Sequence, residues 1–178
     1  CKKSLDLDVS QNLTRDLINE ICQRFQMHDL AQSGKFKDSL KIQVKKLRES
    51  FTKPNCQVSY DDPHVIDAYM IAYYPYYAPL TYRTLYTAVE NGYHPHKQSG
   101  LNLTFFNCGP AAEMIGTVKY LTGKMTDISF RSFLLDLYIS SWSNIQKRLT
   151  INYIENKLSI KNEVFTYKCD FRRPCMSC

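Results

Sequence analysis

The chain has 178 residues, of which 44% are hydrophobic, and this is enough for one well-formed core with a small appended helical domain. No apolar run approaches the roughly 18 residues that a membrane-spanning helix needs, so the sequence predicts no membrane span. The formal net charge of +6 and the pI near 8.9 leave two interpretations open, contact with nucleic acid and a solvated basic surface.

The seven cysteines favour a reduced chain over a disulfide framework. Their number is odd, and Cys108 falls inside a tight turn that the sequence predicts before a helix. Cys169, Cys175 and Cys178 have partial zinc spacing, but three thiolates lack a fourth ligand and no histidine is near them in the sequence. We therefore expect a cytoplasmic protein without a metal site.

Residues 1–60 are expected to form a helical extension. Apolar residues that recur every four positions predict an amphipathic helix ending near Met27, and these are Leu13, Leu17, Ile21 and Phe25. Gly34 separates this helix from a second one.

The second helix is expected over residues 38–51, where Leu40, Val44 and Leu47 share one face. Its basic residues point elsewhere, and they are Lys41, Lys45, Lys46 and Arg48. This basic cluster is either a solvated helix face or a contact with the phosphates of a nucleic acid such as RNA. Both interpretations stay open.

Residues 54–63 are polar, hold two prolines and form the expected boundary between two domains. The sequence thus divides into a helical extension over residues 1–60 and a second domain over residues 61–178. More than half of the thirteen tyrosines lie between Tyr69 and Tyr86. Aromatic residues at this density either stack on bases and line a ligand pocket, or simply pack a helix against a sheet.

The stretch from Leu101 to Leu137 is the centre of the second domain. An apolar run rich in strand formers is followed by a turn, a helical segment and another apolar run that ends in a carboxylate, Asp136. In order, the strand, turn, helix and strand are predicted over residues 101–106, 107–110, 111–121 and 128–135. This order is that of half a Rossmann unit, whose ligand site lies at the carboxyl ends of parallel strands.

The residues of the turn suit a close backbone approach to a ligand. Gly109 has no Cβ, so the main chain there adopts unusual dihedral angles at low cost. Pro110 presets φ near the start of a helix. The N–H groups of Ala111, Ala112 and Glu113 are then expected to face the ligand.

After Asp136, a crossover helix is expected over residues 139–149 and a third strand over residues 161–170. A carboxylate can accept hydrogen bonds from both hydroxyls of a ribose, which makes Asp136 the natural partner for that sugar. The predicted fold class is α/β, a partial Rossmann-like parallel sheet of about three to four strands with an amino-terminal helical extension.

Two segments resemble those of a known family. The string Phe-Phe-Asn-Cys-Gly-Pro-Ala-Ala-Glu at residues 105–113, followed by Leu-Leu-Asp-Leu at residues 134–137, resembles motifs I and II of the class I S-adenosylmethionine-dependent methyltransferases. It is most similar to a subset with a Cys-Gly-Pro-Ala core. Residues 67–83 are similar to the aromatic helix ahead of motif I in ribosome-associated methyltransferase-like proteins, which implies RNA or a ribonucleoprotein as the target.

The resemblance implies S-adenosyl-L-methionine as the cofactor. The turn would hold the amino-acid end of the cofactor through five residues, Asn107, Cys108, Gly109, Ala111 and Glu113. Asp136 would hold the ribose, and Asp170 would hold the adenine amino group. The resemblance assigns no catalytic residue.

The chain departs from the motif I of that family at three positions. The family usually has an acid and three glycines there, whereas this chain has Phe105 at the acid and Asn107 and Ala111 at the first and third glycines. The 27 residues from Gly109 to Asp136 also exceed the roughly 20 expected of a compact nucleotide-binding unit.

No acidic or Asn-Pro-Pro-aromatic motif that would align a methyl acceptor follows Asp170. Three interpretations follow: the cofactor half of a methyltransferase that needs further strands or a partner chain, a non-catalytic Rossmann-like module that binds nucleic acid or protein, and a small α/β interaction domain that binds no nucleotide. The retained carboxylates favour the first, and the lost glycines favour the second. The unpaired edge of the third strand predicts a homo-oligomer or a partner chain that covers it.

Overall fold

The computed structural model describes residues 34–53, 58–92, 100–125 and 128–172, together with residues 15, 16, 19 and 23. Those four residues are helical, and the rest of the helix predicted to end near Met27 lies outside the described residues. The chain divides into two compact units, Cys1–Pro75 and Tyr76–Cys178. The sequence-based boundary after residue 60 thus falls within the first unit.

Within its described residues, the first unit contains the complete helices α2 (Gly34–Thr52) and α3 (Pro63–Ala72). The helix α3 begins where sequence chemistry predicts, because the Asp62 side chain accepts the N–H of His64 at 2.9 Å and proline occupies the first helical turn. Gly34, expected as a separator, is instead the first residue of α2. The helices pack through a small apolar core that is centred on Leu47, Val65 and Ala68.

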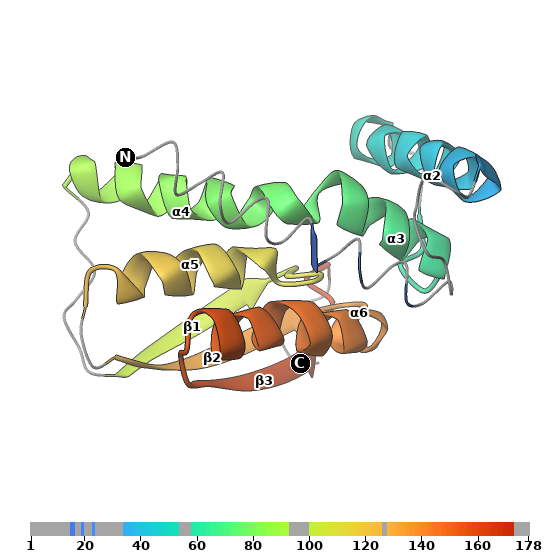
Figure 1. Ribbon diagram of the computed structural model, residues 1–178. Coiled ribbons are helices and arrows are strands. Elements are labelled where there is room, and N and C mark those ends of the chain that lie inside the picture. The colour runs from blue at the N-terminus through green and yellow to red at the C-terminus, as the bar shows by residue number, and fades with distance from the viewer. Residues whose placement is uncertain are drawn as a thin grey trace. The chain divides into compact units, whose positions relative to one another are not determined.

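The second unit holds a parallel three-stranded sheet in the order β1-β2-β3 (Figure 1). The strands are β1 (Gly100–Phe106), β2 (Ser129–Asp136) and β3 (Asn162–Lys168), and α5 (Ala112–Thr122) connects the first two. Ser132 pairs with Leu103 on one side and with Val164 on the other. The α/β class and the three parallel strands predicted from sequence are confirmed, and the arrangement is consistent with part of a Rossmann-like fold.

The connection from β2 to β3 is longer than the helix predicted over residues 139–149. It comprises α6 (Ile139–Ile145) and two π-helical segments, η2 (Gln146–Ile151) and η3 (Tyr153–Lys157). No glycine or proline interrupts this stretch, so the helical path continues until Ser159 takes a left-handed φ of 55°.

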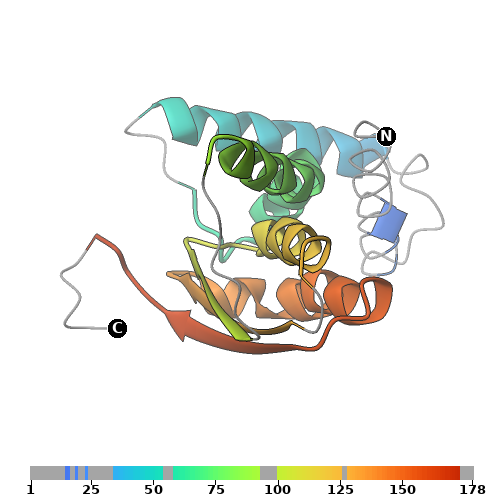
Figure 2. The same ribbon diagram turned by 90° about the vertical axis from the view of Figure 1, so that its left-hand side faces the viewer.

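The helix α4 (Tyr74–Glu90) carries most of the tyrosine-rich stretch and lies beside α5 (Figures 1 and 2). The two helices approach each other closely at Gly116, where a Cβ would come within 2.2 Å of the Ala78 carbonyl oxygen. Tyr82 of α4 and Tyr120 of α5 meet edge to face with ring centroids 5.8 Å apart. Tyr82 therefore packs one helix against another rather than against the sheet, whereas Tyr76 of the same stretch is 66% exposed.

Within the described part of this unit, α5 and α6 lie on the same face of the sheet (Figure 2). Phe130 and Leu134 of β2 are buried on that face. On the opposite face Phe133 stacks on Phe165 with ring centroids 5.3 Å apart, and Phe165 and Tyr167 are 40% and 49% exposed. Parallel sheets are normally covered on both faces, so this exposed aromatic face is an unusual surface.

Cys169 follows β3 and is disulfide-bonded, and its partner lies outside the described residues, as do Cys175 and Cys178. The expectation of a reduced chain rather than a disulfide framework was therefore wrong at this position, because spacing alone does not show which thiols the fold brings together. Disulfides persist in oxidising compartments and are rare in the cytosol, so this bond does not favour the predicted cytoplasmic location. That location stays a prediction. In the described part of the chain, none of the helices combines the length and hydropathy needed to cross a bilayer.

Candidate ligand site at the carboxyl edge of the sheet

The turn between β1 and α5 has several left-handed residues close together. Three of its residues have left-handed dihedral angles, Asn107 (φ 49°), Gly109 (φ 48°) and Ala111 (φ 58°). Glycine and asparagine adopt this region readily, but alanine does so at a cost of roughly 1–2 kcal/mol. Strain of this kind persists only where the surroundings determine the conformation, and it is common at ligand sites.

Asp136 at the end of β2 holds the turn from one side. Its Oδ2 accepts the N–H of Gly109 at 2.9 Å, and its Oδ1 accepts the N–H of Tyr138 at 2.8 Å. The residue is only 7% exposed. Hydrogen bonds to a carboxylate are stronger than those between neutral groups, so Asp136 couples the turn firmly to the second strand.

The helix after β2 holds the turn from the other side. The Gln146 amide donates to the Gly109 carbonyl oxygen at 2.6 Å, and the Thr150 hydroxyl donates to the Pro110 carbonyl oxygen at 2.6 Å. The Trp142 ring lies 3.7 Å from the position that a Cβ on Gly109 would occupy. All three side chains are buried, so the turn is preorganised by packing and by hydrogen bonds to both of its central carbonyls.

These three residues escaped the sequence-based prediction. They are spaced by four along the chain, which places them on one side of a helix. A glutamine and a threonine in line with a buried tryptophan were the signal available. Their acceptors lie 37 and 40 residues away in sequence, and no local pattern specifies such partners.

The electrostatics of the turn oppose a negatively charged thiol. Burial, and to a lesser extent the nearby Asp136 and Glu113 carboxylates, together raise the pKa of Cys108 to about 12. Burial also raises the pKa of Glu113. Cys108 therefore stays protonated at neutral pH and is neither a nucleophile nor a metal ligand in this conformation.

We expect Cys108 to react very slowly with iodoacetamide in the folded protein. At pH 8, a thiol of pKa about 12 has roughly a thousand-fold less thiolate than one at the ordinary value of 9.0. Mass spectrometry of the peptide that contains Cys108, with the urea-unfolded chain as the control, measures the difference. The pKa of the Cys108 thiol is higher in the folded chain (about 12) than at its ordinary value (9.0), so the folded chain binds this proton more tightly. The buried thiol therefore stabilises the fold fully below about pH 9, and this stabilisation is lost as the pH rises towards 12. Equal labelling of the folded and unfolded chains would contradict the buried placement.

The amino end of α5 lies directly after the turn. The N–H of Ala111, which was expected to face a ligand, instead donates to the Cys108 carbonyl oxygen at 2.7 Å. This bond closes the tight turn that the left-handed residues create. The N–H groups of Ala112 and Glu113 belong to the first helical turn and have no acceptor within the helix. The Glu113 N–H bonds to the carboxylate of its own residue, so the Ala112 N–H is the donor left for a ligand.

Asp170 lies at the same edge of the sheet, just beyond β3. The N–H of Cys169 donates to the Asp136 carbonyl oxygen at 3.1 Å, which extends the pairing of the two strands to this point. The Asp170 carboxylate accepts two hydrogen bonds from the Arg172 guanidinium, at 2.8 and 2.9 Å. It is therefore already paired with a cation.

Two exposed aromatic rings complete the edge. Phe106 ends β1 and Phe171 follows β3, and their ring centroids are 5.5 Å apart with the planes at 73°. They are 63% and 39% exposed. Exposed aromatic rings beside hydrogen-bonding groups are the surface on which a flat heterocycle stacks.

The structure thus brings Cys108, Gly109 and Asp136 into direct contact. Ala111 is buried in the same turn, Asn107 is exposed at its start and Glu113 is half-buried at the end of it. Asp170 shares the edge but is bonded to Arg172. No family model, curated protein or solved structure matches the chain. The function is therefore argued from this geometry and from the motif resemblance.

Proposed function

We propose that the carboxyl edge of the sheet binds S-adenosylmethionine, as in the methyltransferases that the motifs resemble. The observation that carries the proposal is the meeting of the left-handed turn with Asp136, at the ends of two adjacent parallel strands. In open α/β sheets, ligands bind outside the carboxyl ends of the strands. The edge also has the first-turn N–H of Ala112 and exposed aromatic rings, which suit a nucleoside with an amino-acid tail.

The residues present fit this ligand chemically. Each Asp136 oxygen accepts one backbone N–H and has a second acceptor position, so it would hold a ribose diol without releasing Gly109 or Tyr138. Asp170 would hold the adenine amino group only after exchanging a hydrogen bond with Arg172. When bound, the cofactor supplies an electrophilic methyl group, and the residues of this chain bind and orient it.

We assign no catalytic residue. Methyl transfer depends mainly on aligning the two reactants, and neither the geometry nor the motif resemblance assigns a residue to the methyl acceptor. We therefore propose a methyltransferase-like cofactor module that acts with further strands or a partner chain. A non-catalytic binding module is the alternative outcome of the test below.

Titration with S-adenosylmethionine and S-adenosylhomocysteine is expected to give micromolar binding. Trp142 is the only tryptophan and lies against Gly109, so its fluorescence reports on the turn directly, alongside calorimetry. Asp170→Asn is expected to weaken binding about ten- to a hundredfold, because one charge-assisted hydrogen bond contributes roughly 1.5–3 kcal/mol. Glu155→Gln is the matched control, since Glu155 is an exposed carboxylate on η3.

Two results would count against the proposal. If the folded chain shows neither heat nor a fluorescence change with either ligand, the proposal that it binds S-adenosylmethionine is wrong. The non-catalytic binding module is then the remaining interpretation. If Asp170→Asn and wild type bind the cofactor with equal affinity, the cofactor proposal stands, but Asp170 does not hold the adenine amino group.

We also propose that a second copy of the chain covers the exposed aromatic face formed by Phe133, Phe165 and Tyr167. The only ion pair described on this face, Arg131 with Glu163, is satisfied internally at 3.1 Å, so the surface is apolar and nearly neutral. We expect sedimentation of the wild type at micromolar concentration to show a dimer, and Phe165→Lys to shift it to monomer. Lys157→Glu on η3 is the control. A wild-type monomer under these conditions would contradict the pairing.

A further inference from the structure

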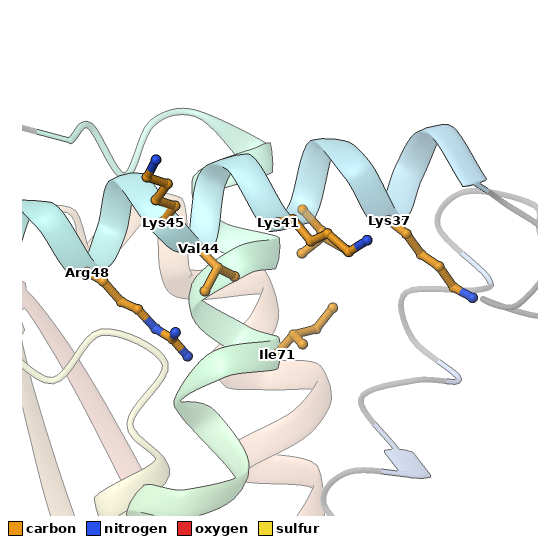
Figure 3. A pocket seen from close by; sticks show the side chains of 7 residues that line it. Lys37, Lys41, Val44, Lys45, Arg48 and Ile71 are labelled. Atoms are coloured by element: carbon orange, nitrogen blue, oxygen red, sulfur yellow. The ribbon is translucent and has the colours of Figure 1, made fainter.

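The first unit has a groove of about 500 Å³ beside α2 (Figure 3). It is lined by six residues of α2 and by one of α3, namely Lys37, Leu40, Lys41, Val44, Lys45, Arg48 and Ile71. Figure 3 shows Val44 pointing down from α2 and Ile71 pointing up from α3, both into the space between the two helices. The surface of the groove is almost entirely apolar, although four of the seven lining residues are cationic.

The four cations form a row along α2. They stand at intervals of four, four and three residues, so Lys37 and Arg48 are about 16 Å apart along the axis at 1.5 Å per residue. Lys41 has a weak contact of 3.5 Å with Asp38, in which both side chains are more than 70% exposed. Within the described residues no carboxylate pairs with Lys37, Lys45 or Arg48. The row is therefore available to an anionic partner.

The shape and the charge together select the partner. A single anionic head group occupies one or two cations, whereas this row of four is long enough for a partner with several anionic groups. A nucleic-acid backbone would pair with the cations but would leave the floor of Leu40, Val44 and Ile71 without apolar contacts. A flat membrane surface fits a convex amphipathic helix rather than a concave groove between two helices.

We infer that this groove binds an acidic amphipathic helix of a partner protein. Aliphatic residues of that helix at positions i, i+3 or i+4, and i+7 fill the floor between α2 and α3. Aspartate and glutamate residues beside its apolar stripe pair with the row of cations and set the orientation. The inference concerns α2 and α3 alone and is independent of the cofactor proposal.

The test uses the full chain and a fluorescent 18-residue helical peptide with leucines on one face and glutamates on both sides. Three control peptides separately remove the amphipathic pattern, the negative charge and the apolar contacts. They have the same residues in scrambled order, lysine for glutamate, and serine for leucine. Fluorescence anisotropy is expected to show binding of the first peptide at micromolar concentration. All three controls are expected to bind at least tenfold more weakly.

The matching protein variant is Lys41→Glu with Lys45→Glu, which reverses two exposed charges on α2. It is expected to bind the acidic peptide at least tenfold more weakly, with unchanged circular dichroism. Lys147→Glu with Lys157→Glu makes the same charge change on exposed residues of η2 and η3 and is expected to leave binding unchanged.

Several outcomes would overturn the inference. Equal binding of the scrambled or serine peptide would show an attraction of charge alone. Retained binding by Lys41→Glu with Lys45→Glu would place the peptide elsewhere. If an 18-nucleotide oligouridine or phosphatidylserine vesicles bound more tightly than the acidic peptide, and Lys41→Glu with Lys45→Glu abolished that binding, the row of cations would be a nucleic-acid or a membrane site instead.

Discussion

Gly116→Ala is expected to destabilise the second unit by about 3 kcal/mol, at the upper end of the usual cost of overpacking. Alanine normally stabilises a helix interior relative to glycine by about 1 kcal/mol, so the expected sign is reversed. The reason is the contact with α4, where the new Cβ would lie 2.2 Å from the Ala78 carbonyl oxygen and 3.0 Å from the Tyr82 nitrogen. These are backbone atoms, so a whole helix must move to relieve the clash.

Urea unfolding followed by Trp142 fluorescence measures the change in free energy. Gly123→Ala is the matched control, because Gly123 follows the same helix, has an ordinary φ of −73° and leaves 3.5 Å around a new Cβ. We expect that variant to stay within about 0.5 kcal/mol of wild type. If Gly116→Ala were as stable as the control, α4 and α5 would not approach each other as the structure shows.

Asp136→Ala is expected to lower the free energy of unfolding by about 2–6 kcal/mol. The substitution leaves the N–H groups of Gly109 and Tyr138 without their acceptor, and each unsatisfied buried donor costs roughly 1–3 kcal/mol. Asp136→Asn is expected to cost about half as much, since an amide has one acceptor oxygen and can serve one of the two donors. The same urea titration measures both variants, and Glu155→Ala provides an exposed carboxylate for comparison.

This prediction also decides how cofactor binding is tested. A carboxylate that holds the turn together affects affinity through the shape of the turn as well as through direct contact. Asp170→Asn changes a carboxylate that does not contact the turn in the described hydrogen bonds, so it reports on ligand contact more directly. If Asp136→Ala proved as stable as wild type, the carboxylate would not hold the turn, and its assignment as the ribose ligand would gain weight.

The boundaries of the sheet could be predicted closely from the sequence. Strand β1 begins one residue before the predicted start, at Gly100, and ends as predicted at Phe106. Strand β2 includes Asp136, which was predicted to follow it directly. Apolar runs, a glycine-proline turn and helical periodicity are local signals, so they can be recognised in the sequence without knowing the tertiary contacts of each residue.

The candidate site could be predicted only in part. The turn and Asp136 were placed at one edge of the sheet correctly, because parallel strands end at the same edge. The bond between Gly109 and Asp136 spans 27 residues, and the bond between Thr150 and Pro110 spans 40. Pairs at such distances depend on how two crossovers pack on the sheet, which no local pattern encodes.

The sequence by itself determined the α/β order of elements, the parallel sheet and the turn at its carboxyl edge, because these follow from local periodicity and from the short-range chemistry of glycine, proline and asparagine. Only the tertiary structure decided that Asp136 accepts hydrogen bonds from backbone donors, that Arg172 forms an ion pair with Asp170 and that Gly116 is a point of contact between helices. The physical reason is that a side chain's partners are set by packing between segments far apart in the chain, where many arrangements share the same local pattern.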